Sequence, residues 1–225
     1  GYDQRRHAFL ALEQFQHQAR VKSRHQHISA ALGKGANFRG YTSRGVDLTA
    51  DWSDEFSFGL LNSRVIASRV LEQLIQPNEA TPSLVRDIAG VVGSTNGFLA
   101  DWSSAPGWTA QWITTLVSGP LTVSTQARWV KEGKVFADRF GPQDTGYNSK
   151  LVNSISDNGL PNYVVWTLSG SYDFAIGETN LNVFGTVNNL FDKDPPLSGV
   201  GVGGTSSVFY DTLGRSYRIG LRATF

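Results

Sequence analysis

The alternation of apolar and polar residues along the chain predicts β-strands. From Ser216 to Phe225 every second residue is apolar, and the residues between them are polar or glycine. A strand points successive side chains to opposite faces of its sheet, so this period of two predicts a strand with one apolar and one polar face. The same pattern recurs in six other segments, which gives seven expected strands in all. The six other segments are 46–52, 57–73, 108–116, 121–129, 164–172 and 181–187.

The connections between these strands alternate between short and long. Residues 53–55, 118–120 and 175–178 are the short ones, and the phase of the alternation slips at Leu60–Leu61, where we expect a β-bulge. The long connections are rich in Gly, Ser, Asn, Asp and Pro; they are 74–106, 132–161 and 192–212. Unstructured loops longer than about 12–15 residues are uncommon in compact soluble domains, whereas membrane barrels have short turns on one side and long loops on the other. We therefore expect an all-β fold, an antiparallel transmembrane β-barrel segment with long extracellular loops.

Residues 1–37 have a different pattern. Ala8, Leu12, Phe15 and Ala19 follow helical spacing among arginines and glutamines, which predicts a short amphipathic helix. We expect an external loop segment over 1–37 and the barrel over 38–225. A helix that binds a membrane surface or a partner is the alternative for the first segment.

Composition narrows the classes of protein. The formal net charge of +1 gives no overall field that would favour nucleic acid. There is no Cys for a disulfide or a thiolate zinc site, and the absence of Met leads us to expect a processed chain or a piece of a longer one. No segment approaches the roughly 18 consecutive apolar residues of a spanning helix. If the protein crosses a membrane, strands must do so, because only helices and closed barrels satisfy their backbone in lipid.

The sequence offers no catalytic motif. The glycines of 199–207 lack the Lys-Ser/Thr pair of a phosphate loop, and no Gly-x-Ser-x-Gly nucleophile motif occurs. We therefore expect no enzyme, no cofactor and no metal site. Most of the six tryptophans fall near the ends of expected strands, which favours an aromatic girdle at a membrane interface over buried tryptophans of a soluble core.

Four segments carry a family resemblance. "VNNLFDKDPP" (187–196) and "YDTLGRSYRIGLRATF" (210–225) resemble the C-terminal sequence of TonB-dependent outer-membrane receptors. "GVDLTADW" (45–52) and "GPLTVSTQARWV" (119–130) resemble earlier strands of the same barrels. The resemblance is specific over 160–225, moderate over 38–131, and absent over the first 37 residues.

The resemblance implies a fold and a function. Members of this family couple a barrel of the 22-strand type to an N-terminal plug and a TonB-binding box, so seven strands correspond to about the C-terminal third of a receptor. It implies a bacterial outer-membrane location and import of a scarce solute such as an iron chelate or a carbohydrate. The implied partners are membrane lipid, the solute, TonB through the missing plug, and the barrel-assembly machinery. A porin-like or structural barrel without energy coupling, and a soluble all-β binding module, are the alternatives.

Two sets of candidate residues follow. Aromatic and cationic groups on external loops suit such solutes; these candidates are Trp102, Arg139, Tyr147 and Tyr210. The final strand resembles the segment that barrel-assembly machinery recognises, through Tyr217, Ile219, Leu221 and Phe225.

Overall fold

The computed structural model describes residues 19–23, 26–34, 41–75, 85–93, 105–197 and 205–225. These residues form β-strands and no helix, so none of them belongs to a helix long and apolar enough to cross a membrane. The strands are β1 (Ala19–Ser23), β2 (Gln26–Lys34), β3 (Tyr41–Phe56), β4 (Gly59–Ile75), β5 (Arg86–Asp87), β6 (Trp108–Ser118), β7 (Leu121–Val130), β8 (Gly133–Lys134), β9 (Gly159–Leu160), β10 (Tyr163–Ile176), β11 (Thr179–Asn188) and β12 (Ser216–Thr224).

Ten of these strands form one antiparallel sheet. Its order is β1-β2-β3-β4-β6-β7-β10-β11-β12, with β5 paired to β4, while β8 and β9 pair separately. Each long strand therefore pairs with its neighbours in sequence, as in an up-and-down meander. The sheet does not close on itself: β1 and β12 are its two edges.

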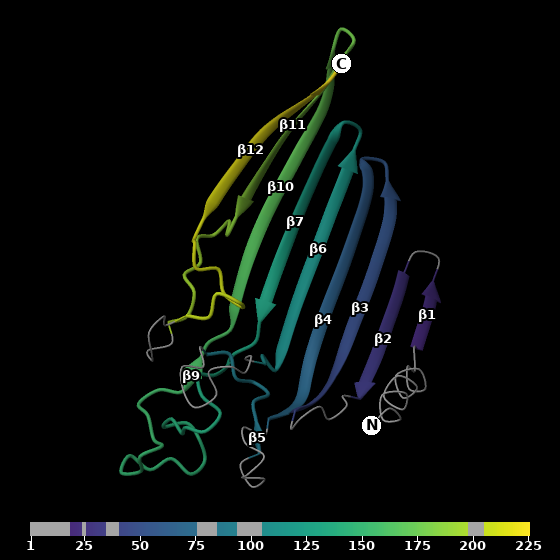
Figure 1. The fold of residues 1–225 in the computed structure, drawn as a ribbon. Coiled ribbons are helices and arrows are strands. Elements are labelled where there is room, and N and C mark those ends of the chain that lie inside the picture. The colour runs from purple at the N-terminus through teal and green to yellow at the C-terminus, as the bar shows by residue number, and fades with distance from the viewer. Residues whose placement is uncertain (1–18, 24–25, 35–40, 76–84, 94–104, 198–204) are drawn as a thin grey trace, which may run out of the picture.

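All seven expected strands are present, and their connections alternate as expected. The turns joining β3 to β4, β6 to β7 and β10 to β11 lie at one end of the sheet together with the C-terminus, and the long connections lie at the other (Figure 1). We call these the turn end and the loop end.

Two details of the β3–β4 hairpin were predicted wrongly. The turn is Ser57–Phe58, not 53–55, because β3 continues to Phe56, which pairs with Gly59. The φ of 142° at Gly59 is accessible to glycine and closes this tight turn. The register shifts opposite Arg44 and Gly45, where Leu71 is the extra residue of β4, and not at Leu60–Leu61. Only glycine fits at position 45, because the Cβ of any other residue would lie 2.7 Å from the Arg69 carbonyl oxygen, which is too close.

The sheet also extends into the segment where we expected no strand. β1 and β2 pair with each other, and β2 pairs with β3 from Gln26↔Trp52 to Lys34↔Arg44. Strands over 19–34 thus replace part of the expected loop segment. The expected helix falls on residues outside the described ranges, apart from Ala19, which begins β1.

The two faces of the sheet differ in chemistry. The register aligns Ala50, Val65, Trp112, Ala127 and Trp166 in one row across five strands. The face that carries this row, here the apolar face, exposes many large side chains to the surroundings, among them Leu48, Val65, Trp112, Val164, Leu168, Val183, Tyr217, Ile219 and Leu221. The opposite, polar face carries rows such as Ser53, Asn62, Thr115, Ser124 and Ser169.

The buried core lies at the loop end and on the polar face. Val130, Tyr163 and Val165 occupy polar-face positions, and residues of the long connections cover them, including Val92, Val135, Phe136, Leu160 and Tyr210. A second cluster joins the end of β4 to the segment after it: Ile75, Ile88, Val91 and Ala105. The long connections are thus anchored on the sheet by apolar packing.

Candidate binding surface at the loop end

The β7–β10 connection is an ordered excursion. β8 pairs with β9 inside it, the Val135 amide donates to the Asn158 carbonyl (2.9 Å), and the Val92 amide donates to the Lys134 carbonyl (2.9 Å). With Val135 and Phe136 buried beneath it, the excursion can present side chains in fixed positions.

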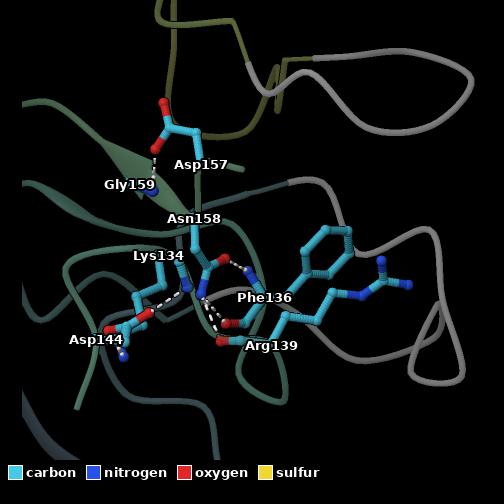
Figure 2. Close-up of polar contacts among 8 residues, drawn as sticks. Lys134, Phe136, Arg139, Asp144, Asp157, Asn158 and Gly159 are labelled. Carbon is cyan, nitrogen blue, oxygen red and sulfur yellow. Dashed lines mark hydrogen bonds and ion pairs between the residues drawn. The ribbon is translucent and has the colours of Figure 1, made fainter. Parts of the chain in front are cut away.

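Asn158 holds this excursion together (Figure 2). Its side chain is 3 % exposed, its Oδ1 accepts from the Phe136 amide (2.9 Å), and its Nδ2 donates to the carbonyls of Phe136 (3.1 Å) and Arg139 (2.7 Å). One buried amide thereby satisfies three backbone groups that no strand pairs. Sequence reasoning missed Asn158, because an Asn-Gly pair in a polar stretch predicts a turn and not its distant partners.

An ion pair fixes the outer part of the same excursion. Lys134 Nζ lies 2.6 Å from Asp144 Oδ1, and the Gly141 amide donates to Asp144 Oδ2 (2.9 Å). The hydrogen bond from Lys134, followed by that from Gly141, lowers the pKa of the Asp144 carboxyl. These residues line a hollow of about 440 Å³, and Gln143, Asp157 and Asn158 also contribute to its lining.

Two of the candidate solute contacts lie on this excursion. The Arg139 guanidinium is exposed and sits 4.6 Å from the centre of the Phe136 ring. Tyr147 is half-buried, and its amide donates to the Asp144 carbonyl (3.1 Å). Phe136 therefore orients the Arg139 guanidinium by a cation–π contact, leaving the charge accessible.

Tyr210 has a different environment from the one its sequence position predicts. It is 2 % exposed, and its ring packs edge-to-face on Tyr163 at 5.2 Å. Its hydroxyl has no hydrogen-bond partner among the described residues, and burial raises the pKa of Tyr210 to about 12. The structure places Tyr210 in the buried core, whereas Arg139 is exposed and Tyr147 is half-buried. Trp102 lies outside the described residues.

The "VNNLFDKDPP" segment forms a bracket at the end of β11. Asn189 is 1 % exposed, with a φ of 48°, and its side chain exchanges two hydrogen bonds with the Lys193 backbone (2.8 and 3.0 Å). Asp192 then accepts from the Arg215 amide (3.0 Å) and from its guanidinium (3.1 Å). These contacts join the two ends of the long β11–β12 connection.

The expected assembly residues lie on the edge strand. Tyr217, Ile219 and Leu221 occupy the apolar face of β12 and are 68 %, 85 % and 63 % exposed, and Phe225 follows the strand at 99 %. β11 pairs with one side of β12. No described residue pairs with the other side, so the strand can be reached by a partner.

Comparison with known proteins adds no identification. No protein-family model matches the chain, and no curated protein matches it either. Within the described ranges, no group of three or more His, Cys, Asp or Glu side chains could hold a metal ion.

Proposed function

We propose that this chain is the C-terminal part of a barrel in the bacterial outer membrane, belonging to a TonB-dependent receptor that imports a scarce solute. The observation that carries the proposal is the apolar face, which exposes valines, leucines and Trp112 in rows across the sheet. A patch of this extent on a soluble protein would mark an interaction surface. Lipid is the partner that a continuous two-faced meander suits best.

The dimensions of the strands agree with a membrane. Val164 and Ile176 are apolar-face residues twelve positions apart on β10. At about 3.3 Å per residue and a tilt of about 45°, they span roughly 28 Å, close to the apolar band of about 25 Å in known barrels.

Three polar groups in the middle of the apolar face are paired with one another. Trp112 Nε1 donates to Ser63 Oγ (2.8 Å), and Ser63 bonds with Thr114 across the strands (3.0 Å). A polar group left unpaired in lipid costs several kcal/mol. The charged Arg69 enters this face only toward the loop end, where it stacks 5.4 Å from the Trp108 ring.

The proposal assigns a side to each end of the sheet. The loop end faces the exterior, where the excursion bearing Arg139 and Tyr147 meets the solute, and the turn end faces the periplasm. The solute is an iron chelate, a carbohydrate or a similar molecule. The edge strand β12 is offered to the barrel-assembly machinery, and energy reaches the barrel from TonB through a plug outside this chain.

Cysteine labelling tests the topology against the unsubstituted complete protein as background, because this part of the protein has no Cys of its own. Lys150→Cys at the loop end and Glu178→Cys at the turn end replace exposed residues. In intact cells producing the complete encoded protein, a membrane-impermeant maleimide should label the first variant only. Once the outer membrane is permeabilised, it should label both. Equal labelling of both in intact cells, or recovery of the protein without membrane, would refute the proposal.

Energy coupling separates the receptor from a passive porin-like or structural barrel. We expect the coding sequence upstream of Gly1 to specify a plug and a TonB box. A complete protein that lacks both would instead be a barrel without energy coupling.

A further inference from the structure

A second hollow lies on the polar face, apart from the excursion described above. It has a volume of about 380 Å³ and lies between strands β7, β10 and β11 and the segment that precedes β12. The sheet contributes Gln126, Arg128, Thr167 and Asn188 to its lining, and the covering segment contributes Tyr210 and Asp211. A hollow of this size can hold a small molecule of sugar or organic-acid dimensions.

The strand register brings its polar side chains together. Gln126 on β7 lies directly opposite Thr167 on β10, and Arg128 lies opposite Val165 one polar-face position nearer the loop end. Directly opposite residues have Cβ atoms about 5 Å apart. A guanidinium, an amide and a hydroxyl can therefore reach one molecule.

These side chains have unused hydrogen-bonding capacity. Among the described residues, Arg128 makes no ion pair or hydrogen bond, and neither the Gln126 amide nor the Thr167 hydroxyl has a partner. Asp211 also lines the hollow, yet it lies beyond ion-pair distance of Arg128, and its Oδ1 accepts from the Leu213 amide (3.0 Å). Arg128 and Asp211 thus remain two separate charges.

We propose that this hollow binds a small hydroxycarboxylate. The planar guanidinium of Arg128 presents a fork of donors that matches a carboxylate. The Gln126 amide and the Thr167 hydroxyl donate to the ligand's remaining oxygens, and Asp211 accepts from a ligand hydroxyl at the other side. A neutral polyol would leave the guanidinium without its anion, and a simple anion would give the second carboxylate oxygen of Asp211 no donor.

The inference deepens the proposed function and rests on it, because it takes the polar face of the sheet to line the path of the imported solute. Gluconate and sorbitol are matched probes, because both are six-carbon polyols and only gluconate has a carboxylate. Equilibrium dialysis against the complete protein in detergent should show gluconate binding about tenfold or more tighter than sorbitol. Arg128→Gln should remove that preference.

Two further variants control the test. Arg222→Gln removes a polar-face arginine toward the turn end that does not line this hollow, and gluconate binding should change by less than about twofold, as for surface changes away from a site. Asp211→Asn keeps an acceptor for the Leu213 amide and should weaken gluconate binding, because a charged acceptor is lost.

Several outcomes would overturn the site. They are a wild-type protein that does not bind gluconate at millimolar concentration, sorbitol binding as tightly as gluconate, or equal losses in Arg128→Gln and Arg222→Gln. If gluconate does not bind here, the topology measured by cysteine labelling still stands. If the protein binds gluconate but is found outside membranes, the proposed function is refuted and the binding site stands.

Discussion

Replacing Asn158 by Ala should loosen the β7–β10 excursion without unfolding the sheet. The substitution removes three hydrogen bonds, to the Phe136 amide, the Phe136 carbonyl and the Arg139 carbonyl. A buried backbone group left without a partner costs about 1–3 kcal/mol. Because Asn158 is 3 % exposed, water reaches the vacated groups only after local opening. Taking partial relaxation into account, we expect the opening free energy of the excursion to fall by about 3 kcal/mol.

Hydrogen exchange measured by mass spectrometry can isolate this effect. A loss of about 3 kcal/mol corresponds to roughly a hundredfold faster exchange at the Phe136 amide when exchange follows the opening equilibrium. Amides of β6 and β10 should keep their protection. Asn148→Ala is the matched control, because it removes only an exposed hydrogen bond, from the Lys150 amide. Unchanged exchange at Phe136, or an equal change in Asn148→Ala, would refute the bridging role of Asn158.

Two other predictions concern strands β11 and β12 and the connection between them. At Gly220 a Cβ would collide with the Phe184 ring opposite, so Gly220→Ala should destabilise the protein by about 1–2 kcal/mol. At Gly170 the atom nearest to an added Cβ is 3.7 Å away, so Gly170→Ala should have little effect. Chemical unfolding compares the two variants, and equal unfolding midpoints would contradict the packing argument. Hydrogen bonds from the Arg215 amide and then from its guanidinium lower the pKa of the Asp192 carboxyl below 3.8. The contact between Asp192 and Arg215 is therefore fully present above pH 3.8 and is lost as the pH falls through the lowered pKa. Hydrogen exchange in the β11–β12 connection, corrected for intrinsic rate, should accelerate over that pH range in the wild type and show no such step in Asp192→Asn.

The strands could be predicted because each strict alternation reflects two different surroundings. Between Leu121 and Trp129 every second residue faces the apolar side, so the local pattern alone identifies β7. The β3–β4 hairpin was less predictable. Asp54 and Glu55 look like turn residues, but they stay in β3 because Glu55 pairs with Leu60 and the turn comes two residues later. Polar residues near the end of a hairpin do not fix the position of its turn.

The candidate surface depends on contacts that no local pattern records. Tyr210 was expected on an outer loop, but it packs on Tyr163, 47 residues earlier in the chain, and Phe136 and Asn158 meet across 22 residues. Val130, Tyr163 and Val165 carry a signal that could have indicated this surface, since they place apolar side chains on polar-face positions. That mismatch requires something to cover them, and the long connections do so. Apolar residues on the polar face at the loop end therefore show where a long connection folds back onto the sheet, and so where its remaining side chains are held in fixed positions.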